Sequence, residues 1–412
     1  MPRILLLVSR TSYRAQAFVA AARRMDVEIT VGSNHSSTLA DLAPDATITL
    51  GAGDVGRAVA TIRRFAEEYP LAAVVAAEDD FAPVAAEASR ALGLRCHGPQ
   101  AVRYARNKAL MREQLAVAGE RSPWFHVASI DDHPTEFAAE ARYPCVLKPL
   151  ALSASRGVIR ADTPEEFILA WTRILGILER QDASRRSGPA RSEILIEEYL
   201  PGREVAVEGI VVDGALKALA IMDKPDPLEG PYFEETMLVT PSRLPEGVQA
   251  EVISTVQRAV TILGLVDGPI HAELRVDGTE ASVLEIAPRS IGGRCSTILR
   301  FEPEATLEDL ILRHSLGLPI GDYTRAEGAT GVMMMPIPRP GILREVSGTE
   351  AALEVPDVEG LEITIPVGQA VETLPEGNRY LGFLFASGET PAAVEASIRE
   401  AHARLRVTIE PS

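Results

Sequence analysis

The chain has 412 residues, which is too long for one ordinary hydrophobic core and predicts roughly two to four domains. Hydrophobic residues make up 46% and charged residues 24%, as in an ordinary globular protein. The 58 acidic residues outnumber the 41 basic ones. The resulting formal charge of −17 argues against a nucleic-acid partner, because phosphate binding needs a basic surface.

The start of the chain and its cysteines bear on the compartment. The apolar run over residues 4–8 is too short for the core of a signal peptide or for a membrane span. The three cysteines, Cys96, Cys145 and Cys295, are odd in number and form no CxxC motif. A disulfide framework or a cysteine metal site is therefore not expected. We expect a cytoplasmic protein without a membrane partner.

The first hundred residues alternate short apolar runs with helical patterns. The runs are 4–8, 27–31, 47–50 and 72–77, and the helical patterns are 15–24, 55–68 and 83–92. Such alternation predicts a parallel sheet covered by helices. No GxGxxG motif follows the first run, so we expect a Rossmann-like domain that binds no dinucleotide.

From about residue 105 the pattern mixes helices with antiparallel strands. We expect helices at 106–118, 164–179 and 247–263, a surface loop at 181–193, and strands at 145–148, 193–197, 204–212, 215–221, 271–276 and 282–287. Asp213 and Gly214 predict a hairpin turn between two of these strands. After residue 325 short strands dominate, and a helix at 391–404 precedes a last strand.

Two glutamates on the strand pair 271–276 and 282–287 are the first candidate site. Alternation places Glu273 on one face of its strand with His271, and Glu285 on one face of the next strand. A connecting loop with an odd number of residues sets them opposite each other, whereas a two-residue turn separates them. Paired carboxylates repel, so a cation such as Mg²⁺ is expected between them. The alternative is two solvated glutamates on an exposed face.

Three further segments carry groups that suit phosphates and a nucleotide. Arg289 followed by Gly292 and Gly293 suits an oxyanion or a phosphate. Lys148 ends a strand before a small-residue loop over 149–157, whose hydroxyls and amides suit phosphates. The segment 194–204 offers backbone groups to an adenine edge, and its Glu204 could bind ribose hydroxyls. Taken alone, a lysine at a strand end is usually solvated and a small-residue loop is usually an ordinary loop, and the alternative for 194–204 is an edge strand followed by a turn.

In this order, the segments resemble the ATP-grasp superfamily. The matching pieces are Asn107-Lys108 at a helix start, YPCVLKPLALSASRGV, ILIEEYLPGREVAVEG and HAELRVDGTEASVLEIAPRSIGG. The resemblance implies an α/β and α+β fold that binds ATP and Mg²⁺ or Mn²⁺. It implies the following roles: Lys108, Lys148, Ser153, Ser155 and Gly157 at the phosphates, Glu197, Glu198 and Leu200 at adenine, Glu204 at ribose, Glu273 and Glu285 at the metal, and Arg289, Gly292 and Gly293 at the reacting acyl phosphate.

Within the superfamily the chain most resembles the bacterial L-amino-acid ligases, which join free amino acids into dipeptides. The likeness extends into MMMPIPRPGILREVSG and the residues that follow. It implies small-molecule carboxylate and amine substrates, with Glu235, His271 and Arg294 near them; acidic residues on a solvated loop are the alternative for Glu235. The family usually has an asparagine metal ligand two residues after the second glutamate, and Ala287 stands there.

We therefore expect an N-terminal α/β domain over 1–105, an ATP-grasp core over 106–325 with a lid at about 120–202, and a β-rich domain over 326–412. The expected activity is an ADP-forming, carbon–nitrogen bond-forming ligase that acts through an acyl phosphate. Two alternatives remain: a ligase of a non-peptide metabolite acid, and a nucleotide-binding regulatory protein without turnover, which Ala287 would suit. A homodimer is one option for its assembly.

Overall fold

The computed structural model describes residues 1–9, 12–35, 43–51, 53–150, 152, 154–180, 192–321 and 323–411. The first part is a parallel sheet of order β3-β2-β1-β4, whose strands are β1 (Arg3–Leu7), β2 (Glu28–Ser33), β3 (Thr47–Thr49) and β4 (Ala73–Ala76). It is flanked by α1 (Ala15–Arg24), α2 (Val55–Glu68) and α3 (Ala82–Leu92). The predicted parallel sheet with covering helices is confirmed.

The expected helix over 106–118 is confirmed as α5 (Lys108–Val117), and a further helix, α4 (Pro99–Arg106), precedes it. Asn107 separates them with an extended backbone, and its side chain accepts a hydrogen bond from the Leu110 N–H at 3.1 Å. This N-cap satisfies one of the free amides at the start of α5, so Lys108 begins a helix as the sequence motif predicts.

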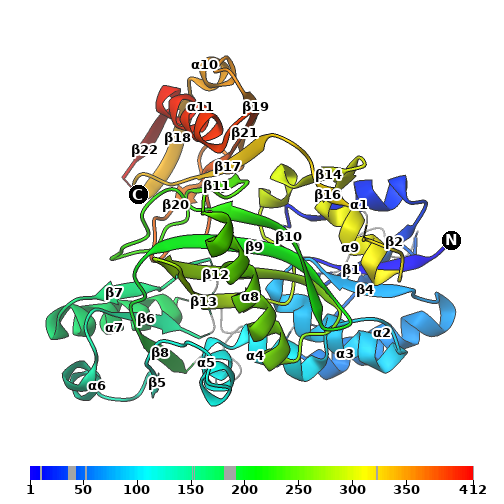
Figure 1. Ribbon diagram of the computed structural model, residues 1–412, viewed down its shortest axis with the longest axis horizontal. Helices are drawn as coiled ribbons and strands as arrows, with labels where there is room; N and C mark the ends of the chain where they lie inside the picture. The colour runs from blue at the N-terminus through cyan, green and yellow to red at the C-terminus, as the bar shows by residue number, and fades with distance from the viewer. Residues whose placement is uncertain are drawn as a thin grey trace.

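A separate antiparallel sheet of order β5-β8-β6-β7 follows, and we call residues 120–202 the lid segment. Its strands are β5 (Phe125–Ser129), β6 (Cys145–Pro149), β7 (Ile159–Ala161) and β8 (Glu193–Glu198). Helices α6 (Pro134–Glu140) and α7 (Pro164–Glu179) pack on it around the buried side chains of Phe167 and Trp171. Figure 1 shows this segment as a teal unit beside the central sheet.

The central sheet has eight antiparallel strands within the described residues, in the order β13-β12-β9-β10-β11-β17-β21-β19. They are β9 (Arg203–Val212), β10 (Ala215–Asp223), β11 (Met237–Thr240), β12 (Gly268–Asp277), β13 (Glu280–Ala287), β17 (Ala329–Met335), β19 (Val358–Ile363) and β21 (Gly382–Gly388). Helix α8 (Glu246–Leu263) packs on one face of β10, β12 and β13, beside α5. The strands of the C-terminal part thus continue the sheet of the core.

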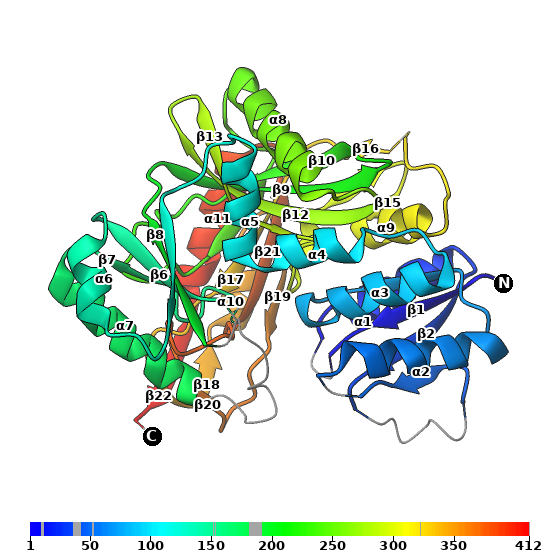
Figure 2. The same cartoon turned by 90° about the horizontal axis from the view of Figure 1, so that it is seen from below.

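The remaining elements complete the C-terminal half. Helix α11 (Pro391–Arg404) packs on β17 and β21, and α9 (Leu307–Ser315) packs on α1. Two small sheets contain β14 (Arg300–Glu302), β15 (Ala305–Thr306) and β16 (Thr324–Arg325), and β18 (Gly341–Ser347), β20 (Ala370–Val371) and β22 (Arg406–Glu410). A short helix, α10 (Thr349–Leu353), contacts α11. Figure 2 shows the N-terminal sheet and the lid segment on opposite sides of the central sheet.

A search of the described residues for membrane-spanning helices found none of sufficient length and apolar character.

Candidate active site

A cavity of about 880 Å³ is lined by all parts of the chain. Tyr13 and Asp79 come from the N-terminal part, Lys148 from the lid segment, and Tyr380 from the loop before β21. The strands β12 and β13 supply the two predicted metal-binding glutamates. A cavity of this size accommodates a nucleotide-sized ligand together with small substrates.

Glu273 and Glu285 lie directly opposite each other in the ladder between β12 and β13. The connection is nevertheless a two-residue turn, because Asp277 pairs with Glu280, and strict alternation would then put the two carboxylates on opposite faces. A bulge at Leu284 supplies the missing shift: Leu274 pairs with Val283, and Glu273 then pairs with Glu285. An extra residue in one strand changes which face the following side chains occupy. Val283 accordingly lies in the core, although strict alternation assigned it to the face of Glu285.

Arg112 of α5 holds this bulge in place. Its side chain is fully buried, and it donates hydrogen bonds to the carbonyls of Val283 at 3.1 Å and Leu284 at 2.9 Å. Its Nε also donates to Glu197 of β8 at 3.0 Å. A bulge leaves backbone groups without ladder partners, and a guanidinium has enough donors to satisfy two carbonyls and one carboxylate. Arg112 thereby ties β13 to β8, the strand that leads into the predicted adenine segment.

The lysines predicted at the phosphates both lie in the cavity, and both are paired with carboxylates. Lys108 lies 2.7 Å from Glu285, and Lys148 forms an ion pair with Glu197. Burial by itself raises the pKa of Glu197, but Arg112 and Lys148 outweigh burial and lower it to about 2. Glu197 is therefore a buried anion that orients two cations, and its carboxylate is not free for other ligands.

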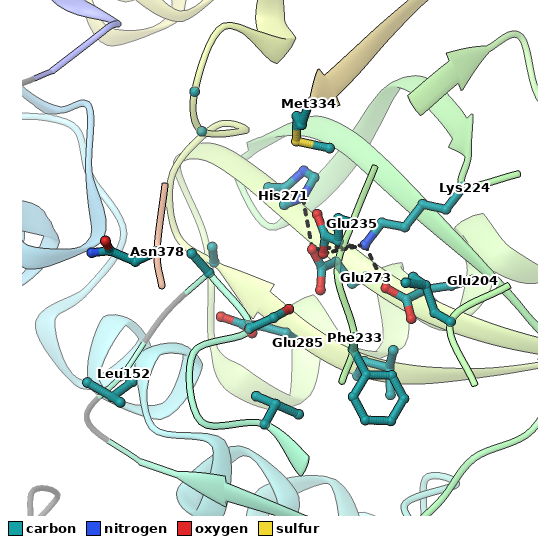
Figure 3. Close-up of a pocket in the computed structure, with 18 of the residues that line it drawn as sticks. Leu152, Glu204, Lys224, Phe233, Glu235, His271, Glu273, Glu285, Met334 and Asn378 are labelled. Atoms are coloured by element: carbon teal, nitrogen blue, oxygen red, sulfur yellow. Dashed lines mark hydrogen bonds and ion pairs between the residues drawn. The ribbon is translucent and has the colours of Figure 1, made fainter. Parts of the chain in front are cut away.

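Lys224 lies at the centre of three carboxylates. Its Nζ is 2.6 Å from Glu204, 2.7 Å from Glu235 and 3.2 Å from Glu273 (Figure 3). The three carboxylates are close enough together to hold a metal ion, and the ammonium group of Lys224 lies between them. Glu273 belongs both to this cluster and to the facing pair with Glu285, and Glu285 in turn pairs with Lys108. Burial and the charge of Glu273 raise the pKa of Glu235 to about 7.

His271 of β12 is linked through Glu208 to the loop after Arg289. Its Nδ1 is 3.0 Å from Glu208, and its Nε2 is 3.5 Å from Glu273. Burial alone lowers the pKa of His271, but the hydrogen bonds with Glu208 and Glu273 raise it to about 9. Glu208 also accepts the backbone N–H of Ile291 at 3.1 Å. His271 pairs across the ladder with Ala287, so it lies beside the position where the family has asparagine.

Arg14, at the start of α1, contacts the same loop from the other side. Its guanidinium donates to the carbonyl of Ile291 and to the Ser290 hydroxyl, the latter at 3.0 Å. It also forms a buried ion pair with Glu308 at 2.9 Å, and Glu308 accepts the Ser296 hydroxyl at 2.7 Å. The N–H of Ile291 is thus held by Glu208 and its C=O by Arg14, which fixes the backbone immediately before Gly292.

Arg289 lines the cavity and pairs with Asp79 at 2.5 Å. Burial by itself raises the pKa of Asp79, yet Arg289 keeps it below its ordinary value. Asp79 follows β4 of the N-terminal sheet, at the carboxyl end of a parallel strand, where open α/β sheets bind ligands. Asp79 accordingly lines the cavity at this end of the sheet.

Most of the sequence-predicted site residues line this cavity. They are Lys108, Lys148, Ser155, Glu197, Glu198, Leu200, Glu204, Glu235, His271, Glu273, Glu285, Arg289, Gly292 and Gly293. Gly157 does not line it, and its N–H donates to the carbonyl of Pro375 at 3.0 Å. Arg294 does not line it either: it borders a second, smaller cavity and pairs with Glu362 at 3.3 Å. Ser153 lies outside the described residues.

Sequence reasoning missed four charged residues that shape this site. Arg14, Arg112 and Glu208 are almost fully buried, and Lys224 is 7% exposed. A charged side chain on the apolar face of a helix or strand signals a buried partner, since such groups are rarely buried unless paired. Arg112 within α5 and Glu208 within the apolar run of β9 carry that signal. The partners themselves are far away in the sequence.

Comparison with protein families matches three segments of the chain. Residues 141–298 match an ATP-grasp domain, residues 19–94 an ATP-grasp N-terminal domain, and residues 333–410 the L-amino acid ligase C-terminal domain 2. The fold is similar to the crystal structure of an L-amino acid ligase from Bacillus licheniformis, with a TM-score of 0.81 and 23% identity. That match covers 100% of this chain and 99% of the other.

Two curated relatives are similar over part of the chain. The alanine–anticapsin ligase of Bacillus amyloliquefaciens is 29% identical over 248 residues, which cover 57% of this chain and 52% of the relative. The dapdiamide A synthase of Enterobacter agglomerans is 30% identical over 191 residues, or 46% of this chain and 43% of the relative. The matched part thus spans about half the length of these relatives. The chain has an ATP-grasp fold, contains a matched ATP-grasp domain and is similar to the L-amino acid ligases.

Proposed function

We propose that the chain is an ADP-forming ligase that joins two L-amino acids through an acyl-phosphate intermediate. The observation that carries the proposal is the facing pair Glu273 and Glu285, which lies in one cavity with Lys108, Lys148 and Arg289. Carboxylates for a metal, lysines for phosphates and an arginine for a developing anion are the groups that phosphoryl and acyl transfer need. The similarity to the alanine–anticapsin ligases and to the dapdiamide A synthase supports amino acids as the substrates.

The residues fit a divalent cation and ATP. Glu273 and Glu285 offer the hard oxygen ligands that Mg²⁺ prefers, and each pairs with a lysine in the structure. When bound, Mg²⁺ would neutralise phosphate charge and polarise the γ-phosphoryl group. Lys108 and Lys148 would bind phosphate oxygens, and the extended segment from Glu198 to Leu200 would hold the adenine.

In the proposed reaction, an oxygen of the first substrate's carboxylate bonds to the γ-phosphorus of ATP, and the bond to the bridging oxygen breaks to release ADP. The amine nitrogen of the second substrate then bonds to the acyl carbon. The carbon–oxygen bond to phosphate breaks, and the nitrogen loses a proton, which yields an amide and phosphate. Arg289 would stabilise the oxyanion at the acyl carbon, and the backbone near Gly292 would lie close to it.

Glu235 would bind the ammonium group of the first amino acid. It lines the cavity, and its neighbour Lys224 is itself bound by two more carboxylates. An ammonium group entering here would find a partly buried carboxylate, and a charge-assisted hydrogen bond to it would be stronger than one between neutral groups.

The test is a screen of L-amino-acid pairs for ADP and phosphate release, with mass spectrometry of the products. We expect release only when an acid and an amine are both present, together with a condensed product. Each substrate omitted in turn, and the Glu285→Gln variant, are the controls. ATP hydrolysis that is equal with and without amino acids, and no condensed product, would contradict a ligase. A product formed only from an acid that is not an amino acid would favour the non-peptide alternative.

A further inference from the structure

The loop before β21 forms one wall of the cavity, and its position is fixed by the lid segment. The carbonyl of Pro375 accepts the Gly157 N–H at 3.0 Å, and Arg156 donates to the carbonyl of Glu376 at 2.9 Å. Arg173 of α7 holds the Glu376 carboxylate with two hydrogen bonds, at 2.6 and 2.9 Å. The loop before β21 and the lid segment are therefore in direct contact at the cavity.

The loop before β21 contains a hydrogen-bonded turn that requires glycine at position 377. The N–H of Gly377 donates to the carbonyl of Thr373 at 2.8 Å, and a Cβ at Gly377 would collide with the backbone carbonyl of Glu372. A residue larger than glycine would force this turn to open. The turn directs the next residues, Asn378 and Arg379, to the wall of the cavity, and Figure 3 shows Asn378 across the cavity from Lys224 and Glu204.

Arg379 differs from the other lysines and arginines that line the cavity. Lys108, Lys148, Lys224, Arg275 and Arg289 each form an ion pair with a glutamate or an aspartate. Arg379 donates to the neutral amide oxygen of Gln369 at 3.1 Å, and no carboxylate of the described residues forms an ion pair with it. An arginine whose partner is neutral retains its charge for a ligand, and its planar fork matches a carboxylate in bidentate geometry.

The proposed reaction leaves one anion without an assigned partner. The carboxylate of the first amino acid is consumed in the acyl phosphate, but the second amino acid attacks through its amine and keeps its α-carboxylate. Closing the cavity over that carboxylate removes water from it, which is costly unless a cation replaces the water. The phosphates have Lys108, Lys148 and the metal, and the acyl oxyanion has Arg289.

We propose that Arg379 binds the α-carboxylate of the amine substrate and so selects α-amino acids over amines that lack a carboxylate. This inference rests on the proposed ligase function. Because Arg379 follows the segment that contacts the lid, the amine substrate would be recognised by the closed arrangement of lid and loop. A phosphoryl group also offers Arg379 a pair of anionic oxygens. The experiment therefore distinguishes the α-carboxylate of the amine substrate from a phosphate of ATP as the ligand of Arg379.

The experiment compares Arg379→Gln and Arg379→Lys with the parent enzyme on one acid substrate and two amines, a free L-amino acid and its primary carboxamide. For Arg379→Gln, kcat/KM for the free amino acid should fall about tenfold or more, mainly through KM, since a hydrogen bond to a charged group is worth about 1.5–3 kcal/mol. The value for the carboxamide should stay unchanged, and so should the KM for ATP. Arg379→Lys should recover part of the loss, because it keeps the charge without the fork.

Arg344→Gln is the matched control, since Arg344 is exposed, pairs with Glu410 at 2.7 Å and does not line the cavity. An equal loss for both amines, or a raised KM for ATP, would assign Arg379 to the phosphates or to the fold and overturn the proposal. An Arg379→Gln enzyme with the parent preference for the free amino acid would overturn it too. Failure of the ligase function itself would be visible separately, because the parent enzyme would then form no amide with either amine.

Discussion

Arg14 offers a direct test of how the N-terminal part supports the active site. It lies outside the ATP-grasp motifs, yet its buried guanidinium contacts the carbonyl of Ile291, the Ser290 hydroxyl and the Glu308 carboxylate. We expect Arg14→Met to destabilise the protein and to lower kcat more than it raises the KM for ATP. The second effect follows because the loop after Arg289 loses the anchor on its carbonyl side.

The magnitude follows from what the substitution leaves behind. The Glu308 side chain is 3% exposed, and without Arg14 it retains one neutral partner, the Ser296 hydroxyl. Removing one member of a buried ion pair costs about 3–5 kcal/mol, because the other charge remains buried and unpaired. Adding Glu308→Gln removes that charge. The double variant should then cost less than Arg14→Met alone, and the remaining loss should reflect the Ile291 carbonyl, at about 1–3 kcal/mol.

The assay is urea unfolding of the parent, both single variants and the double variant, followed by circular dichroism. Fluorescence would be a poor probe, because Trp124 and Trp171 both lie in the lid segment. Hydrogen exchange across residues 290–293 and steady-state kinetics complete the comparison. A double variant at least as unstable as Arg14→Met would refute the buried-charge argument. An unchanged kcat together with unchanged exchange across residues 290–293 would refute the positioning role.

Three further predictions concern the metal and phosphate groups. Glu285→Gln should lower kcat by more than roughly 100-fold, since loss of residues that only hydrogen-bond to metal ligands already costs about 10–100-fold. A variant with the parent rate would show that Glu285 is not a metal ligand. Ala287→Asn should be tolerated and should lower the Mg²⁺ concentration for half-maximal rate, measured by metal titration; an unchanged requirement would mean that position 287 does not face the metal. Lys148→Met should weaken ATP binding about tenfold or more in calorimetry, whereas Arg289→Met should spare ATP binding and lower kcat roughly 100-fold or more; the reverse pattern would exchange their roles.

Some of the site could be predicted because local rules decide it. The faces of β12 follow from strict alternation: Ile270, Ala272, Leu274 and Val276 lie in the core, while His271 and its alternate neighbours line the cavity. The parallel N-terminal sheet follows from apolar runs separated by helical patterns. Both features depend on the period of a single element, and a period can be read without knowing what packs against it.

Other features could not be predicted, because their cause lies elsewhere in the chain. The bulge at Leu284 depends on Arg112, which is 172 positions away and satisfies the carbonyls that the bulge frees. The contact between Gly157 and Pro375 joins two loops with no pattern of their own. Such contacts join residues that are far apart in the sequence. A local pattern can show that one residue needs a partner, but it does not show which distant residue that partner is.

Substitution of Arg112 would test this long-range support and, through Glu197, the pH dependence of the protein's stability. Glu197 is 2% exposed and its pKa is lowered to about 2: burial raises it, but the charges of Arg112 and Lys148 outweigh burial. A carboxyl group with a lowered folded pKa stabilises the fold above its unfolded pKa, near 4.5, and loses that contribution as the pH falls toward 2. Parent stability should therefore decrease across this window.

Arg112→Met should make the free energy of unfolding less dependent on pH in this window, because it removes one of the two cations that lower the pKa of Glu197. At pH 7 it should cost about 1.5–3 kcal/mol for the lost hydrogen bond to the Glu197 carboxylate, which keeps Lys148 as a partner, with a further loss from the two bulge carbonyls. Arg112→Lys should recover the charge but not the three-way hydrogen bonding. Urea unfolding at pH 7 and at pH 3 measures both effects. If Arg112→Met were as stable as the parent at pH 7 and kept its slope with pH, the bulge and its facing glutamates would not depend on this arginine.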